Sequence, residues 1–257
     1  MFTDRFLRHR LGATLTPEER ALIEGGVDRV KTLEPRQTVA VAGRRLSHST
    51  LLVDGFMCRY LDDRRGLRQL VAVHVPGDFV DLHAYPLQKL DHDVATLTAV
   101  TIATVPHAAL DRIVQDRPEL ARKLWYSTLL DAAIHRAWLF RLGRLDAAGR
   151  VAHFLCETDL RLQAVGLSDG RRFALGITQA DLSEICGLTS VHINRVMRSL
   201  REDGIVSFRS ALVEIHDPER LRQKGEFDPA YLYIDGQSLA AESAVEPGAG
   251  EAAIIRR

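Results

Sequence analysis

Two short amphipathic patterns lie close together in residues 177–206, and this feature constrains the fold of the chain more than any other. The segment reads ITQADLSEICGLTSVHINRVMRSLREDGIV. The first pattern is centred on Leu182 and Ile185, and the second places apolar residues at helical spacing from Ile193 to Leu200. Neither pattern has enough apolar surface to form a stable helix alone, so the two helices must pack against each other and against neighbouring elements.

The residues around these patterns predict where each helix begins and ends. Thr178 and Thr189 stand where N-caps are expected, and Asp181 completes a capping-box-like pattern with Thr178. Gly187 is expected to end the first helix, because the tight turn requires a left-handed residue there. Downstream, GIVSFRSALVEI (residues 204–215) is typical of two strands joined by a turn. Together these elements predict a helix-turn-helix with a β-wing.

The outward face of the second helix indicates what the module binds. From Thr189 to Arg201 the helix carries three arginines and no acidic residue, although the whole chain has no net charge. A positive rod of this kind suits the major groove of DNA, which lies between two rows of phosphates. The alternative is a helix pair that contacts only protein.

The candidate DNA contacts fall into two groups. Arg195 is the best-placed base reader, because a guanidinium can bond O6 and N7 of guanine together, and Asn194 can add an adenine or backbone contact. The base-reading residues are predicted to be Val191, Asn194 and Arg195. The residues predicted to position the phosphates are Thr178, Thr189, Ser190, His192, Arg198 and Arg209.

The composition is that of a folded protein whose affinity for nucleic acid must be local. Apolar residues make up 46% of the 257 positions, enough for two cores, and the 34 basic and 34 acidic side chains cancel. The three cysteines, Cys58, Cys156 and Cys186, are far apart, which favours reduced thiols over a disulfide framework. The start of the chain lacks the apolar core of a secretory signal, and no apolar run is long enough to span a membrane. We therefore expect a cytoplasmic location.

Between residues 27 and 105 the chain consists of short β-branched segments. Clusters of Gly, Pro, Asp and Arg separate them at the spacing of an all-β sandwich or barrel, which predicts a compact antiparallel roll. A short helix capped by Thr16 precedes the roll. His74 alternates with Val73 and Val75, so we expect it to point outward from its strand.

A helix of about 25 residues, or about 37 Å, is predicted from Pro118 to Leu142. Its apolar residues fall on two faces, so the helix needs two apolar partners. The roll can cover one face, and the same helix of a second copy is expected to cover the other in a two-fold pairing. The alternative is a central helix buried within one chain. The predicted dimer interface consists of Leu120, Leu124, Ile134 and Trp138.

Three features together resemble a known family. They are a β-roll ending in PGDF (residues 76–79), the long paired helix, and the segment 177–206. Over roughly residues 10–216 the chain resembles the CRP/FNR family of bacterial transcription regulators, which includes the catabolite activator protein. The resemblance implies an α+β fold with an antiparallel jelly roll like a cyclic-nucleotide-binding domain, a long dimerisation helix and a C-terminal winged helix-turn-helix. It also implies a homodimer that reads a palindromic site with half-sites about one helical turn apart.

Four segments are expected on this basis. Residues 1–117 form an N-terminal helix and the β-roll sensor domain, and residues 118–143 form the dimerisation helix. Residues 144–217 form the winged helix-turn-helix DNA-binding domain. Residues 218–257 form a C-terminal extension, of which AAESAVEPGAGEAA (residues 240–253) is predicted to be disordered because it has little to bury.

The chain departs from the family at its ligand motifs. Members that bind cyclic nucleotides carry a Gly-Glu pair after the PGDF-like turn and later an Arg-Ser or Arg-Thr pair. Here Asp81-Leu82 and Asp93-Val94 stand in those places, and an aspartate would repel the cyclic phosphate, so we expect no cyclic AMP binding. Iron-sulfur members carry a cysteine cluster that the N-terminal region of this chain lacks. Members that read the commonest half-site carry glutamate where Val191 stands, so a different half-site is expected.

An effector of unknown identity is expected to bind the roll. The candidate pocket residues are Asp81, Leu82, His83, Asp93 and Val94. His83, Asp91, His92 and Asp93 also form a loose cluster of possible metal ligands, but their spacing matches no metal motif. By default they are interpreted as solvent-facing loop residues, and no metal or cofactor is predicted.

These features predict a DNA-binding transcription regulator. The expected partners are double-stranded DNA, a second copy of the chain, RNA polymerase and the small-molecule effector. Binding to a membrane is not expected. The alternative is a ligand-binding or protein-binding roll whose C-terminal domain has weak or lost DNA binding. An enzyme is not expected, because the sequence has no nucleophile paired with a base, no metal triad and no phosphate loop.

Overall fold

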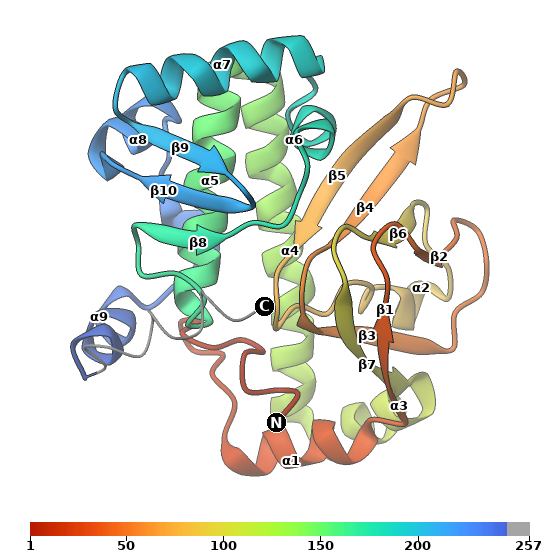
Figure 1. Ribbon diagram of the computed structural model, residues 1–257. Helices are drawn as coiled ribbons and strands as arrows, with labels where there is room; N and C mark the ends of the chain where they lie inside the picture. The colour runs from red at the N-terminus through yellow and green to blue at the C-terminus, as the bar shows by residue number, and fades with distance from the viewer. Residues whose placement is uncertain (246–257) are drawn as a thin grey trace. The chain divides into compact units, whose positions relative to one another are not determined.

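The chain folds into two compact units. The structure, a computed structural model, describes residues 1–245 (Figure 1). The first unit is Met1–His135 and the second is Arg136–Arg257, so the division falls inside one continuous helix, α4 (Pro118–Arg144). This helix confirms the predicted one and extends two residues beyond Leu142. The predicted division into four segments stays a prediction.

The first unit contains the predicted roll, built from two antiparallel sheets. The strand order is β1-β7-β3 in one sheet and β2-β6-β4-β5 in the other. In Figure 1, β4 and β5 form a long hairpin. The strands are β1 (Arg29–Leu33), β2 (Thr38–Ala40), β3 (His48–Asp54), β4 (Met57–Asp62), β5 (Arg68–His74), β6 (Asp93–Thr96) and β7 (Val100–Pro106).

The helices of this unit are α1 (Pro17–Gly26), α2 (Ala84–Leu87), α3 (His107–Asp116) and the first part of α4. The predicted N-cap of α1 is confirmed. The Thr16 hydroxyl accepts from the Glu19 amide at 3.2 Å, and the Glu19 carboxylate accepts from the Thr16 amide at 2.7 Å. Side chains from α1, α3 and α4 join those of the β1-β7-β3 sheet in one apolar core, which orders the helices against the roll.

One ion pair joins β4 to α4 inside the first unit. Arg59 is buried, its Nε donates to the Val80 carbonyl at 2.8 Å, and its Nη1 lies 2.6 Å from an Asp131 carboxylate oxygen. The prediction that His74 points outward is wrong, because His74 is only 3% exposed. The last three residues of β5 are all buried, so the two-residue alternation does not hold at this end of the strand.

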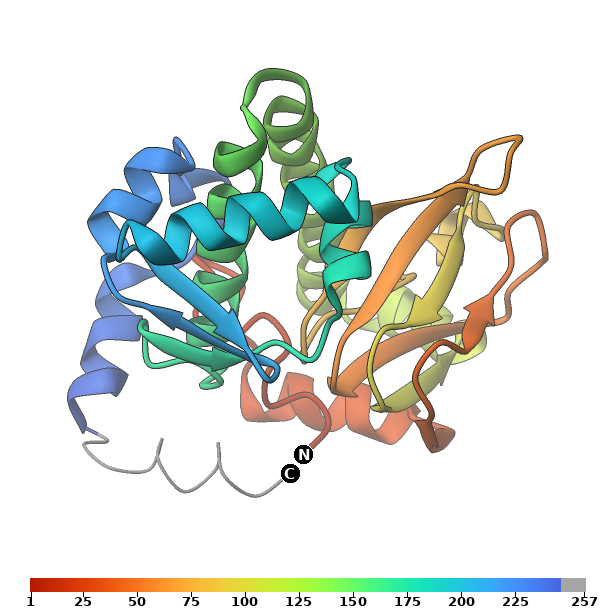
Figure 2. The ribbon, with the colours of Figure 1, turned by 45° about the horizontal axis from the view of Figure 1, so that its top comes forward.

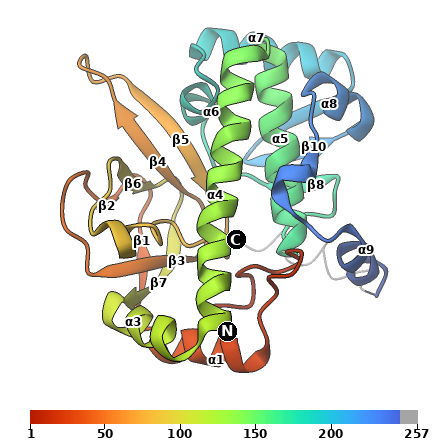
Figure 3. The ribbon, with the colours of Figure 1, turned by 180° about the vertical axis from the view of Figure 1, so that it is seen from behind.

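The second unit contains the winged helix-turn-helix. Its sheet has the order β8-β10-β9, and Figure 2 shows α7 lying beside the β9–β10 hairpin. Figure 3 shows α5 running alongside the carboxyl-terminal part of α4. The elements are α5 (Ala147–Ala164), β8 (Arg172–Ala174), α6 (Gln179–Cys186), α7 (Ser190–Glu202), β9 (Val206–Arg209), β10 (Leu212–Ile215), α8 (Pro218–Lys224), the 3₁₀ turn η1 (Pro229–Leu232) and α9 (Gly236–Val245).

Two further predictions concern the ends and the thiols of the chain. The predicted disorder is wrong for residues 240–245, which lie in α9, whereas residues 246–253 lie outside the described residues. The absence of a disulfide framework is confirmed, since all three cysteines are free and buried. Within residues 1–245, every helix is too short or too polar to cross a lipid bilayer.

Candidate nucleic-acid interface

The first helix of the helix-turn-helix begins and ends where the sequence predicts. The Thr178 hydroxyl accepts from the Asp181 amide at 3.2 Å, and the Asp181 carboxylate accepts from the Thr178 amide at 2.7 Å. The same hydroxyl donates to Asp181 at 2.8 Å, so the side chain of Thr178 is engaged in the cap. Gly187 has φ +60° and ends α6 in the left-handed conformation that favours glycine.

The second helix, α7, has one buried and one exposed face. Thr189 caps it by accepting from the His192 amide at 3.3 Å. Arg195, Arg198 and Arg201 are all exposed, as is every other residue predicted to contact DNA from this helix. The predicted inward residues are buried, namely Ile193, Val196, Met197 and Leu200. The positive face predicted for α7 is therefore available to a partner of the second unit.

The three predicted base readers lie on this exposed face. Val191 is 70% exposed, and Arg195 lies one helical turn further along. The Asn194 side-chain amide donates to the Ser190 carbonyl at 2.9 Å, so its own helix holds the Asn194 side chain in place. A residue held in this way is ordered before binding, which lowers the entropic cost of a contact.

The wing is a β-hairpin whose turn has two residues. β9 and β10 pair from Val206 opposite Ile215 to Arg209 opposite Leu212. The turn between them consists of Ser210 and Ala211, which have φ +50° and +62°. Both values lie in the left-handed region that two-residue hairpins require and that residues other than glycine rarely adopt. Arg209 is exposed directly before this turn.

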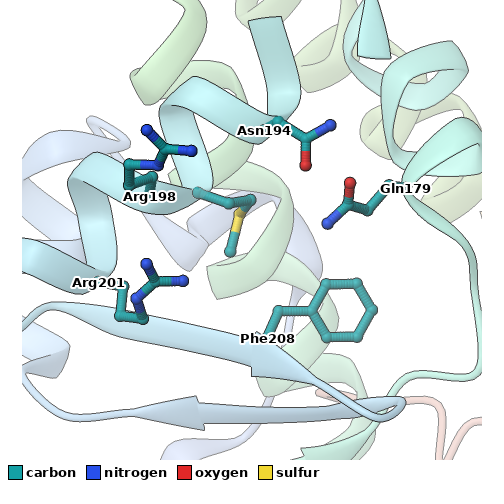
Figure 4. A pocket seen from close by; sticks show the side chains of 6 residues that line it. Gln179, Asn194, Arg198, Arg201 and Phe208 are labelled. Atoms are coloured by element: carbon teal, nitrogen blue, oxygen red, sulfur yellow. The ribbon is translucent and has the colours of Figure 1, made fainter. Parts of the chain in front are cut away.

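A shallow pocket of about 210 Å³ lies where α6, α7 and β9 meet (Figure 4). Four of its residues were not among the predicted contacts, namely Gln179, Met197, Arg201 and Phe208. In Figure 4 the amides of Gln179 and Asn194 face each other, and both guanidiniums lie on the α7 side. The signal that could have identified Gln179 is its place directly after the cap of α6, where an exposed amide can reach a phosphate. The full lining is Gln179, Asn194, Met197, Arg198, Arg201 and Phe208.

The predicted dimer interface is wrong in its choice of helix face. Leu120 and Leu124 belong to the apolar core of the roll, and Ile134 is 8% exposed. The Trp138 ring packs on Phe154 with 6.2 Å between ring centroids. These side chains are buried within their own chain, so a second copy cannot reach them.

A different stripe of α4 is exposed. Trp125 is 65% exposed, Leu129 55%, Leu139 74% and Phe140 46%. The four residues are separated by four, ten and one positions. With 3.6 residues per turn, these separations place all four side chains on one side of the helix. We call these four residues the α4 stripe. Sequence periodicity showed that two faces are apolar, but it did not show which face the roll covers.

Several of the predicted effector residues are engaged in packing or hydrogen bonds within the first unit. Leu82 and Val94 are buried in two different apolar clusters. Asp81 is 2% exposed and accepts from the Thr50 amide at 2.6 Å, and burial raises its pKa to about 6. An oxygen of Asp93 accepts from the Ala42 amide at 2.6 Å. Both carboxylates therefore hold backbone within the roll.

The histidines of the loose cluster are less exposed than expected. His92 is only 7% exposed, and its ring lies 5.4 Å from that of His83. Burial and the nearby Arg59 lower the pKa of His83 to about 3, which keeps its ring neutral. The default interpretation as solvent-facing loop residues is therefore wrong for His92, although Asp91 is exposed. Among residues 1–245 no group of three or more His, Cys, Asp and Glu side chains can hold a metal ion.

The helix-turn-helix is similar in sequence to a known family of DNA-binding domains. Residues 149–224, which run from the first turn of α5 to the end of α8, match the Crp-like helix-turn-helix domain family. Within these residues the second unit has the features of a winged helix-turn-helix domain: two capped helices, a left-handed glycine turn, a basic face and a wing.

The relatives extend the likeness beyond this domain. The chain is 24% identical over 204 residues to an anaerobic regulatory protein of Haemophilus influenzae, covering 79% of each chain. It is 27% identical to the transcriptional activator protein FnrL of Cereibacter sphaeroides, covering 78% of this chain and 82% of FnrL. The solved structure of FixK2 from Bradyrhizobium japonicum superposes with a TM-score of 0.69 at 23% identity, covering 76% of this chain and 96% of that one. The chain is thus similar to transcription regulators of the CRP/FNR type, and the part that matches a family model is its Crp-like helix-turn-helix domain.

Proposed function

We propose that the protein is a sequence-specific DNA-binding transcription regulator that acts as a homodimer on a palindromic site. The observation that carries this proposal is the exposed face of α7, with three exposed arginines and no acidic residue from Thr189 to Arg201. A helix of this charge gains affinity by releasing the counterions of DNA, and its width fits the major groove. Regulation of transcription follows from occupying a site near a promoter.

Each exposed side chain has a distinct proposed role. Arg195 reads guanine, Asn194 reads adenine or supports the backbone, and Val191 contacts a thymine methyl group. The phosphates are positioned by Thr178, Thr189, Ser190, His192, Arg198 and Arg209, with Gln179 added from the pocket in Figure 4. Because the side chain of Thr178 is engaged in its cap, its contribution is to hold the start of α6, where backbone amides attract phosphate.

The α4 stripe is the proposed dimer interface in place of the residues predicted from the sequence. Exposed aromatic and leucine side chains in a row on one helix are unusual on a lone soluble chain, because water contact with that apolar area is unfavourable. A second copy related by a two-fold axis would cover the stripe with the same stripe. The pairing presents two α7 helices, and this accounts for the expected palindromic site.

The remaining roles follow from the family and from the roll. We propose that the protein acts in the cytoplasm, contacts RNA polymerase, has no catalytic activity and responds to a small molecule other than cyclic AMP. The expectation that cyclic AMP is not bound is supported by Asp81 and Asp93, which stand in the sequence where cyclic-nucleotide-binding members carry the residues for ribose and phosphate. The competing proposal, a binding roll without DNA affinity, has no observation in its favour comparable to the face of α7.

A gel-shift experiment with a genomic fragment library tests the proposal. The wild-type protein is expected to bind selectively and to lose affinity steeply as salt rises. Arg195→Ala should weaken selective binding by about 1–3 kcal/mol. Arg222→Ala, which removes an exposed arginine of α8, is the matched control and should change little. If Arg195→Ala leaves both affinity and site preference intact, α7 does not read DNA in the proposed way.

A further inference from the structure

The second unit buries an arginine that its core does not need for charge balance. Arg141, on the carboxyl-terminal part of α4, has no exposed surface. Its guanidinium carbon lies 4.0 Å from the centre of the Trp138 ring and 5.6 Å from that of Phe154. Its one hydrogen bond runs from Nη2 to the Ile185 carbonyl at 3.1 Å, and its Nε and Nη1 have no partner among residues 1–245.

The nearby acid, Glu157 of α5, is satisfied without Arg141. It accepts from the Trp138 indole nitrogen at 3.0 Å and from the Tyr231 hydroxyl at 2.7 Å. The Arg161 guanidinium lies 3.4 Å from a Glu157 oxygen and balances its charge. The cluster therefore holds one acid and two arginines, and Arg141 is the additional cation.

The C-terminal segment after α8 completes this cluster. Tyr231 stacks on His153 of α5 with the ring planes 11° apart, and His153 Nδ1 donates to the Gly225 carbonyl at 2.9 Å. Phe227 packs edge-on against the same His153 ring, and Leu232 is fully buried. Gly225 and the residues that follow it lie beyond the 149–224 match, so this segment is an addition to the domain in the described structure.

The one hydrogen bond of Arg141 is made near the carboxyl end of α6, directly before the turn of the helix-turn-helix. Ile185 is the next-to-last residue of α6, and two residues later Gly187 makes the turn that sets the direction of α7. Arg150 of α5 donates to the adjacent Cys186 carbonyl at 3.3 Å. Two guanidiniums from two helices thus hold the carboxyl end of α6, where carbonyl groups lack helical partners and favour positive charge.

Burial of an additional cation favours folding little, because the lost hydration offsets the attraction that it gains. Arg141 is better explained as a residue that holds the turn of the helix-turn-helix to α4. We propose that Arg141 is a positioning residue for DNA recognition, which fixes the direction of α7 by holding the Ile185 carbonyl. The C-terminal segment supports it by completing the hydrogen bonds of Glu157. This inference rests on the proposed function, since it concerns how α7 is presented to DNA.

Arg141→Met in the full chain tests the proposal. Methionine keeps the length and apolar contacts of the stem, and it leaves Glu157 balanced by Arg161. We expect a free energy of unfolding equal to or above that of the wild type, together with a loss of about tenfold or more in affinity for the selected DNA site. Arg161→Met is the matched control. It removes the cation that pairs with Glu157 and leaves only Arg141, which makes no hydrogen bond to Glu157, so it should lower the free energy of unfolding.

Two further readouts separate positioning from a general structural role. Arg141→Lys keeps a cationic donor near Ile185 and should bind DNA better than Arg141→Met. Amide hydrogen exchange at residues 186–190 should be faster in Arg141→Met than in the wild type while exchange in α5 stays unchanged. Unchanged affinity in Arg141→Met, equal binding by the lysine and methionine variants, or a parallel loss of stability and affinity would each overturn the proposal. If the wild type itself binds no duplex, the proposed function fails, and hydrogen exchange still decides whether Arg141 orders the turn.

Discussion

Arg59 in the first unit and Arg141 in the second are both buried beside or on α4, but their surroundings differ. In the first unit Arg59 donates to the Val80 carbonyl, pairs with Asp131 at 2.6 Å and approaches His83 at 3.5 Å. In the second unit Arg141 makes one hydrogen bond and lies against aromatic rings. Burial opposes ionisation of Asp131, but Arg59 outweighs it and holds the pKa of that carboxyl at about 2.

The comparison shows that a buried charge can serve two different purposes. Arg59 has a counter-ion, so removing it leaves a carboxylate without its partner and should destabilise the roll. Arg141 is an additional cation in a cluster that is balanced without it, so removing it should alter geometry more than stability. On this account Arg59 stabilises the roll, whereas Arg141 fixes the direction of α7 within the second unit.

Arg59→Met has the largest expected effect and tests the first half of this comparison. We expect the first unit to lose about 3 kcal/mol of unfolding free energy, at the lower end of the range for a broken buried pair because Asp131 is 27% exposed. Urea denaturation followed by tryptophan fluorescence measures the loss. If Arg59→Met proves as stable as Arg141→Met, the distinction between the two arginines is wrong.

The pH dependence of the first unit comes next in size. Burial, together with the charge of Arg59, lowers the pKa of His74 to about 4. Unfolded histidine titrates near 6.5, so this contribution to stability is complete above that pH and is lost as the pH falls towards 4. Between pH 7 and pH 5 the loss is about 2 kcal/mol.

A variant isolates this effect from other groups. The raised pKa of Asp81 acts in the opposite direction, because its protonated form is favoured in the fold below about pH 6. The difference between wild type and His74→Gln removes this shared contribution. The variant should lose less stability than the wild type between pH 7 and pH 5, and equal losses would show that His74 is not held neutral.

Caps in the second unit give a smaller effect that is confined to that unit. Thr178→Ala removes the side-chain half of the capping box of α6 and should cost about 1 kcal/mol of unfolding free energy. Thr178→Ser keeps the hydroxyl and serves as control. Circular dichroism during urea unfolding gives both values, and a loss as large in the serine variant would exclude the cap as the cause.

The wing turn gives the smallest expected effect. Ala211 has φ +62°, where a side chain is strained, so Ala211→Gly should raise stability by about 0.5 kcal/mol. Leu212→Ala, in the strand beside the turn, is a control that should not stabilise. A lower melting temperature for Ala211→Gly would contradict the strain inferred at this turn.

Local chemistry made the helix-turn-helix predictable from sequence. Thr178, Gly187 and Thr189 act through hydrogen bonds and backbone angles within four residues, so their roles are visible in the sequence. An antiparallel roll was likewise expected from β-branched segments and turns, but the order of its strands was not predicted.

What could not be predicted depends on contacts between distant residues. The two apolar faces of α4 have similar composition, and only the packed roll decides that Leu124 is buried while Trp125 is exposed. His74 follows an alternating pattern, yet both faces of that strand end are covered. Arg141 is an ordinary residue of a helix end in sequence, and its burial becomes evident only when Phe154 and the α6 carbonyls surround it.

The most direct test of the central claim is selection of bound duplexes from a random DNA pool with the full chain. The account predicts enrichment of a two-fold symmetric site with half-sites about one helical turn apart. The same selection with Leu129→Glu, which places a charge in the α4 stripe, should enrich no symmetric site. Failure of the wild type to enrich any sequence, or enrichment of a single half-site without its symmetric partner, would contradict a dimer that presents two α7 helices to DNA.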